Sequence, residues 1–340
     1  MSTRTIRALF GTSLAAAVLS TGAFLPGPLG TASAATPPVS GTAIRSHLDP
    51  TAGRPVVAAA IRAHLDLDAG QMPESIVADR HGSVDVAFAG ARQVARIAAD
   101  GTVTVLATLP APQDPTAVTP LLGFPLASGL VRAGDTFFVL YATGSAAETG
   151  VWTFTEGRPP RRFAALPADG LPNGMVRDGA TGDLYITDSA RGVVHRVSAR
   201  GHVTVFSDDP ALASTGFFGA NGIKIKDGWL YVSNLDKGTV ARTPLTGRGA
   251  GVFTSVATGL AGIDDFAFTG RGEQFLASLV TRDQVVLAGG GTVPVTVLTA
   301  ADGLSNPTAV LVRGDRIYVT SAAYTTQRDP NLLVARLARR

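Results

Sequence analysis

The sequence contains no cysteine in its 340 residues. This absence excludes a disulfide framework, a zinc site with thiolate ligands and a lipid anchor attached to a cysteine. The stability of the fold is therefore expected to come from burial of apolar side chains, with or without a bound metal ion. The chain is long enough for a large core, because 45% of its residues are hydrophobic and 16% are charged.

A long apolar run is also missing. The N-terminal run from Ala8 to Leu19 is too short, and too rich in Gly, Ser and Thr, to span a membrane. Two arginines precede it and the small-residue sequence Ala32-Ser33-Ala34 follows it, as in a secretory signal peptide. We expect residues 1–34 to be removed, by cleavage after Ala34 or Ala35, and the protein to be secreted to the extracellular space without stable membrane insertion. The alternative is an unstructured apolar N-terminus.

The charge balance gives no sign of a nucleic-acid partner. Without the predicted signal the chain has 27 basic and 26 acidic residues, a net charge of about +1. No run of Lys and Arg is interleaved with aromatic residues. Residues 35–54 are rich in Pro, Ser, Thr and Gly and predict a flexible leader. Residues 55–340 are then expected to form one domain.

This domain has almost no helical periodicity and predicts an all-β fold. Short alternating strands are separated by Gly, Asp and Pro turns. Six segments share one pattern, in which a polar residue precedes a short strand, a turn, a stronger strand and two weaker strands. The spacings between the polar residues are 54, 45, 48, 43 and 42 residues, which is the length of a four-stranded propeller blade. These opening residues are Glu74, Ser128, Asn173, Asn221, Asp264 and Asn306.

Six repeats predict a six-bladed β-propeller. The last repeat has room for about three strands before the chain ends. The segment RPVVAAAIRAHLDL, residues 54–67, resembles the fourth strands of other repeats. We therefore expect it to close the ring by pairing with the last blade, which removes the free sheet edges. A β-sandwich is the alternative fold, but it does not explain six matched units.

The opening residues are candidates for a metal site. In a propeller the first strand of each blade lines the central channel, so the residues at the heads of these strands converge. Carboxylate and amide oxygens without His or Cys suit a hard cation, above all Ca²⁺. The alternative is that Asn and Asp form turn bonds before each strand. The predicted ligands are Glu74, Asn173, Asn221 and Asp264, with Asp265 as a further candidate and Ser128 and Asn306 as channel-lining residues.

The segments PESIVAD, PNGMVRD, ANGIKIKDGWLYVSN and GIDDFAF resemble the SMP-30/gluconolactonase/LRE-like six-bladed propellers, relatives of the paraoxonases. The resemblance covers residues 55–340. It implies a channel-bound Ca²⁺, or another divalent cation, held by Glu74, Asn173, Asn221 and Asp264. It also implies hydrolysis of a lactone or related ester, a small-molecule substrate, with Asp264 as the base or nucleophile. Asp264-Asp265 matches the paired Asp-Asn of the paraoxonase branch. We expect a monomer.

Some features leave other functions open. No histidine lies at a blade head, so no residue there can form a His dyad of the paraoxonase type. Ser128 stands where a carboxylate or amide could have added to the site. NHL-like and strictosidine synthase-like propellers share the blade pattern, and many of them bind ligands without this chemistry. Three classes therefore remain: a Ca²⁺-dependent hydrolase of a lactone, ester or phosphotriester; a non-catalytic propeller that binds a small molecule, glycan or protein; and a biosynthetic propeller.

Overall fold

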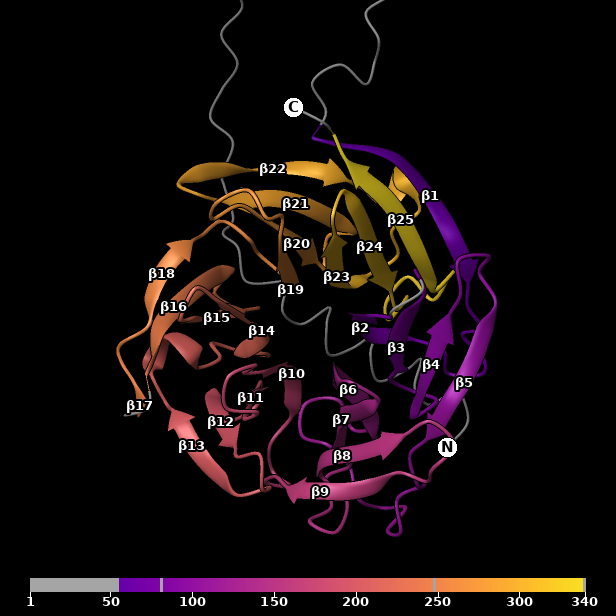
Figure 1. Ribbon diagram of the computed structural model, residues 1–340, viewed down its shortest axis with the longest axis vertical. Coiled ribbons are helices and arrows are strands. Elements are labelled where there is room, and N and C mark those ends of the chain that lie inside the picture. The colour runs from indigo at the N-terminus through magenta and orange to yellow at the C-terminus, as the bar shows by residue number, and fades with distance from the viewer. Residues whose placement is uncertain (1–54, 80–81, 247–248, 339–340) are drawn as a thin grey trace, which may run out of the picture.

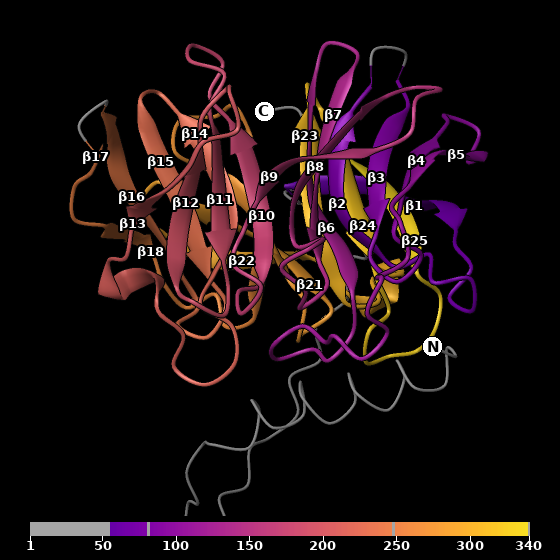
Figure 2. The same ribbon diagram turned by 90° about the horizontal axis from the view of Figure 1, so that it is seen from below.

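A computed structural model of the protein describes residues 55–79, 82–246 and 249–338. Six antiparallel sheets stand around a common axis (Figure 1). Seen from the side, the inner strands run along that axis (Figure 2). The predicted six-bladed propeller is confirmed. The predicted signal peptide and leader, residues 1–54, lie outside the described residues.

Each blade begins at the centre of the ring and proceeds outward. Blade one has β2 (Pro73–Ala78), β3 (Val84–Phe88), β4 (Gln93–Ile97) and β5 (Val103–Thr108). Blade two has β6 (Leu126–Ala133), β7 (Thr136–Ala142), β8 (Gly150–Thr155) and β9 (Arg161–Ala165). Blade three has β10 (Pro172–Arg177), β11 (Leu184–Asp188), β12 (Val193–Val197) and β13 (Val203–Ser207).

The remaining blades follow the same order. Blade four has β14 (Ala220–Lys226), β15 (Trp229–Asn234), β16 (Thr239–Thr246) and β18 (Thr254–Ala257), with the two-residue β17 (Gly249–Ala250) also paired to β16. Blade five has β19 (Ile263–Phe268), β20 (Phe275–Leu279), β21 (Gln284–Gly289) and β22 (Thr292–Leu298). Blade six has β23 (Pro307–Arg313), β24 (Arg316–Ser321), β25 (Asn331–Leu337) and the N-terminal strand β1 (Val56–His64).

The ring is closed by β1, as the sequence predicts. β1 pairs antiparallel with β25, from Val56 opposite Leu337 to His64 opposite Asn331. The outer edge of the last blade is therefore occupied by the beginning of the domain, which joins the two ends of the described chain. The only helical elements among the described residues are two 3₁₀ turns, Pro210–Leu212 and Ala300–Asp302, and neither is long or apolar enough to cross a membrane.

Apolar side chains fill the space between neighbouring blades. One buried cluster joins Val86 and Phe88 of blade one to Ala309 and Tyr318 of blade six. Similar clusters lie at the other junctions, and alternate residues of the middle strands supply most of them. Burial on both faces explains why β3, β11 and β20 consist entirely of buried residues.

The Asn-Gly pairs at the heads of two inner strands are explained by close approach of the next blade. A Cβ atom at Gly174 would lie 2.3 Å from the carbonyl oxygen of Asn221. A Cβ atom at Gly222 would lie 2.5 Å from Oδ1 of Asp265 and 2.9 Å from the carbonyl oxygen of Asp264. Only glycine fits there without displacing backbone atoms. These pairs begin inner strands and do not close hairpins.

This close approach makes Gly222 a test of blade packing. We expect Gly222→Ala to lower the free energy of unfolding by about 1–3 kcal/mol, because the added methyl group overpacks the junction. The matched control is Gly179→Ala, since a Cβ atom there meets nothing within 4 Å and surface changes usually cost under about 0.5 kcal/mol. Urea unfolding of both variants measures the difference. Equal losses would contradict the packing argument.

Candidate functional site

The heads of the inner strands surround a small pocket with a cavity volume of about 30 Å³. Three of the predicted ligands line it, and they come from three blades: Glu74 on β2, Asn173 on β10 and Asp264 on β19. Thr281 and Tyr324, which follow the second strands of blades five and six, add the other polar groups. The cavity has room for an ion, a water molecule or the carbonyl end of a substrate.

Glu74 carries an unusual pKa. Part of its side chain remains accessible from the pocket, but protein atoms surround its carboxyl group, and this desolvation raises its pKa to about 7. The Tyr324 hydroxyl donates a hydrogen bond to Oε2 of Glu74, which opposes the rise, and the charge of Asp265 adds to it. Burial and the charge of Glu74 in turn raise the pKa of Tyr324.

Asp264 is the second acid of the pocket. Burial raises its pKa well above the ordinary value, and the charges of Glu74 and Asp265 raise it further. The amide of Asn221 and the charge of Lys224 act in the opposite direction without offsetting the rise. Glu74 and Asp264 therefore cannot both be ionised easily at neutral pH unless a cation joins them.

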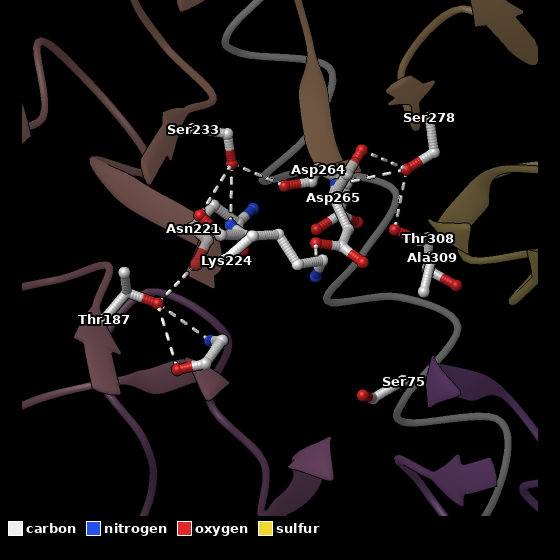
Figure 3. A network of polar contacts seen from close by, with 12 residues as sticks. Ser75, Thr187, Asn221, Lys224, Ser233, Asp264, Asp265, Ser278, Thr308 and Ala309 are labelled. Carbon is white, nitrogen blue, oxygen red and sulfur yellow. Dashed lines mark hydrogen bonds and ion pairs between the residues drawn. The ribbon is translucent and has the colours of Figure 1, made fainter. Parts of the chain in front are cut away.

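The two asparagines lie differently with respect to these acids. Asn173 lines the pocket and its Nδ2 donates to Oγ of Ser189, 3.2 Å away. Asn221 is 2% exposed and stands beside Asp264 (Figure 3). Its amide is close enough to lower the pKa of Asp264, yet its buried Nδ2 meets hydrogen-bond geometry with no protein group. Exchange of the amide oxygen and nitrogen by a half-turn of the side chain would offer the oxygen to a ligand beside Asp264.

Asp265 has a cation of its own. Its Oδ1 lies 2.5 Å from Nζ of Lys224 on the neighbouring blade (Figure 3). The Lys224 ammonium also lies over the ring of Phe266, 5.6 Å from its centroid. Asp265 is not among the residues that line the pocket. The structure therefore brings Glu74, Asn173 and Asp264 together, with Asn221 beside them, and places Asp265 in an ion pair next to the site.

The structure places Ser128 and Asn306 in other contacts. Ser128 Oγ donates to the carbonyl oxygen of Pro172 at 2.8 Å, across a blade junction. Asn306 links separate segments: its Oδ1 accepts from the backbone N–H groups of Thr325 and Thr326, and its Nδ2 donates to the carbonyl oxygen of Val280. Neither side chain is among those that line the pocket. In blade six the head of the strand is occupied by Pro307-Thr308.

Hydroxyl groups on the second strands hold the backbone of the site residues. Pairing is irregular at the heads of β10, β14 and β19, which leaves backbone groups without ladder partners. Ser233 Oγ accepts from the N–H of Gly222 at 2.7 Å and donates to the carbonyl oxygen of Asp264 at 2.8 Å. The same arrangement recurs (Figure 3) in Thr187, between Gly174 and Asn221, and in Ser278, between Asp265 and Thr308.

The repeat pattern did not predict Tyr324 or the apolar residues of the pocket. Tyr324 directly follows the strand–turn sequence of the last repeat, where an aromatic residue has no counterpart in the other repeats. Except for Leu126 at the start of β6, the apolar residues lie in loops and turns of unequal length. Their signal in the sequence was therefore weak, although FPL at the start of β6 and FFG before β14 are apolar stretches next to irregular segments.

The donor set fits a hard cation. Among residues 55–79, 82–246 and 249–338, no group of three His, Cys, Asp or Glu side chains could hold a metal ion alone. An ion in this pocket would depend on amide oxygens in addition to Glu74 and Asp264. Two carboxylates and two amides are ligands of the kind that Ca²⁺ takes. The raised pKa values of Glu74 and Asp264 agree with a site in which a bound cation would offset the two carboxyl groups.

Comparison with solved structures identifies similar propellers. A gluconolactonase from Xanthomonas campestris is 15% identical, with a TM-score of 0.61 over 86% of this chain and 93% of the other. The calcium-binding protein regucalcin from Agrobacterium tumefaciens is 18% identical, with a TM-score of 0.57 over 81% and 93%. An inactive variant of virginiamycin B lyase from Staphylococcus aureus, with quinupristin, is 15% identical, with a TM-score of 0.55 over 83% and 100%.

These similarities confirm, at the level of the fold, the predicted resemblance to gluconolactonase-type six-bladed propellers. No protein-family model and no curated protein sequence matches the chain. At such low identity the shared backbone does not transfer an activity, and the similar structures include both a gluconolactonase and a lyase. The function must be argued from the pocket.

The two hydrogen bonds of the Ser233 hydroxyl, to the N–H of Gly222 and the carbonyl of Asp264, give a testable prediction. We expect Ser233→Ala to lower the free energy of unfolding by about 1–3 kcal/mol, because the N–H of Gly222 and the carbonyl of Asp264 lose a buried partner. Ser233→Thr is the matched control, since Thr187 holds the equivalent position in blade three. Chemical denaturation measures both. Equal stability of the Ala variant and the wild type would show that these groups find other partners.

The pKa of Glu74 makes the stability of the ion-free protein depend on pH. A carboxyl whose pKa rises from 4.5 to about 7 on folding binds protons more tightly in the folded state. Its contribution is therefore fully present below pH 4.5 and is lost as the pH rises to about 7. We expect the Tm of the chelator-treated wild type, relative to that of Glu74→Gln, to fall over this interval.

Added Ca²⁺ should reduce that fall, because ionised carboxylates then have a cation to bind. The measurement is a set of thermal melts between pH 4 and 8, with and without Ca²⁺, for both proteins. A wild-type Tm that rises relative to Glu74→Gln between pH 4.5 and 7 without the ion would contradict the desolvation of Glu74.

Proposed function

We propose that this protein is an exported, Ca²⁺-dependent hydrolase that acts on a lactone or related ester. The observation that carries the proposal is the convergence of two desolvated acids, Glu74 and Asp264, and the amide of Asn173 from three blades onto one small pocket. The buried amide of Asn221, from a fourth blade, stands beside Asp264 (Figure 3). Burying two acids without a cation is costly, and a binding site for a cation explains why they are there.

Glu74, Asn173, Asn221 and Asp264 would hold the ion. When bound, Ca²⁺ would supply a positive charge that keeps the carboxyl groups ionised and polarises the carbonyl group of the substrate. The protein's own groups supply the rest. The Tyr324 hydroxyl orients Glu74 through its hydrogen bond. The carbonyl of Asp264 is fixed by Ser233, so its carboxyl group is presented to the pocket from a rigid backbone.

Asp264 is the residue we propose as general base. In its ionised form it can accept the proton of a water molecule that attacks the ester carbonyl. The tetrahedral intermediate then expels the ring or leaving-group oxygen, which takes that proton from Asp264 and returns the carboxyl group to its ionised form. Apolar walls around the pocket exclude bulk water and strengthen the electrostatic interactions within it. Glu74, whose carboxyl accepts from Tyr324, is assigned to ion binding and not to proton transfer.

The test is hydrolysis of a panel of lactones and aryl esters, with Ca²⁺ and with chelator. We expect activity that the chelator abolishes. At saturating Ca²⁺, Asp264→Asn should lower kcat by about 10²–10⁴, the usual contribution of general-base assistance, while the fold survives. The matched control is Asp227→Asn, which removes the same charge from an exposed turn outside the pocket, where the Asp227 side chain is 77% exposed.

Two results would change the assignment. Equal kcat for wild type and Asp264→Asn would remove Asp264 from the mechanism. No hydrolysis by the wild type, combined with a Ca²⁺-dependent Tm, would favour a binding propeller in which the ion only stabilises the channel.

A further inference from the structure

Apolar side chains enclose the acids of the pocket. They come from the loop before β6 and the first residue of β6, from the loop before β14 and from the turns after β15 and β20, so four separate segments contribute to one wall. Every one of them is mostly buried. The six residues are Leu122, Leu126, Phe217, Phe218, Leu235 and Val280.

The aromatic part of this wall is fixed in place. The rings of Phe217 and Phe218 are stacked, with centroids 4.1 Å apart and planes 5° from parallel. The carboxylate of Asp236 accepts hydrogen bonds from four consecutive backbone N–H groups of their loop, residues 215–218, at 2.8–3.1 Å. The backbone N–H of Asp236 donates to the carbonyl oxygen of Phe218. The wall is therefore formed before any ligand binds.

The same pocket offers little to a polyhydroxylated ligand. Beyond the acids and Asn173, its polar lining consists of Thr281 and Tyr324, and the Tyr324 hydroxyl already donates to Glu74. No lysine or arginine is among the lining residues. Sugar hydroxyl groups would lose water against leucine, phenylalanine and valine without gaining partners. Methylene groups gain free energy in the same place.

We infer that the pocket selects esters or lactones that carry an aliphatic or aromatic substituent over sugar lactones. Phe217, Phe218 and Val280 are the specificity-determining residues. A cavity of about 30 Å³ accepts only the carbonyl end, so the substituent must lie along these side chains. The inference rests on the proposed function, which places the scissile carbonyl beside Glu74 and Asp264.

The first experiment is a chain-length series on the wild-type protein with saturating Ca²⁺. The substrates are γ-lactones with methyl, propyl, butyl and hexyl substituents, together with glucono-δ-lactone. We expect kcat/KM to rise about fourfold for each methylene group that becomes buried, and glucono-δ-lactone to be hydrolysed more slowly than the methyl lactone. A flat series, or a preference for glucono-δ-lactone, would overturn the inference and leave the proposed function standing.

The second experiment assigns the selectivity to the wall. Val280→Thr replaces a methyl group with a hydroxyl group of similar size, and we expect it to lower the hexyl-to-methyl ratio of kcat/KM about tenfold. Val205→Thr makes the same replacement on β13, where the side chain is 57% exposed, and should leave the ratio unchanged. Phe218→Ala should lower the ratio at least as much as Val280→Thr. Unchanged ratios in both pocket variants would overturn the assignment of the wall.

Binding without hydrolysis separates the inference from the proposed function. Cyclopentanones with the same alkyl substituents have no scissile ester bond, and calorimetry measures their Kd directly. Affinity that rises with chain length, in a protein that hydrolyses no lactone, would support the apolar site and reject the hydrolase. Affinity that is independent of chain length would overturn the apolar site whatever the hydrolysis result.

Discussion

The close approach of six inner strands at the axis is the constraint on which the structure depends. Blades that meet at this distance leave no room for side chains at some positions, and glycine occupies those positions. The strand pairing is also irregular there, so some backbone N–H and C=O groups lack ladder partners. Short hydroxyl side chains supply those partners. A hydroxyl group links the two blades at every one of the six junctions, through Ser75, Ser128, Thr187, Ser233, Ser278 and Thr308. These links fix the strand heads, and the strand heads carry the site.

The electrostatics of the pocket follow from that geometry. Strands held so close together place Glu74 and Asp264 where water is scarce, and both pKa values rise because desolvation outweighs the favourable contacts. The ion pair of Lys224 with Asp265 shows the contrast: the acid next to Asp264 in sequence does not line the pocket and finds a cation within the protein.

The sequence was sufficient for the architecture because each blade repeats the same pattern. Strand alternation, turn residues and the spacing of the heads predicted six blades and the closing strand β1. The convergence of Glu74, Asn173 and Asp264 followed from equivalent positions in the repeats. The repeat position did not predict the environment of Asn306, because Asn306 precedes its strand by one residue and its side chain bonds to the loop after β24. The apolar wall could not be predicted, because its loops differ in length from blade to blade and no local periodicity places them over the pocket.

The two parts of the site therefore have different physical origins. The acids are positioned by the repeated scaffold, which the similar propellers share, and a scaffold of this kind can support more than one chemistry. The wall is positioned by contacts that do not repeat from blade to blade in this chain, above all the hydrogen bonds of the Asp236 carboxylate to the backbone of the stacked pair Phe217 and Phe218. An apolar wall next to desolvated acids also lowers the local dielectric constant, which strengthens the electrostatic interactions of any charge that forms between them. Selectivity for the ligand and strength of the electrostatic interaction are thus set by the same loop residues, so a change in the wall should alter both together.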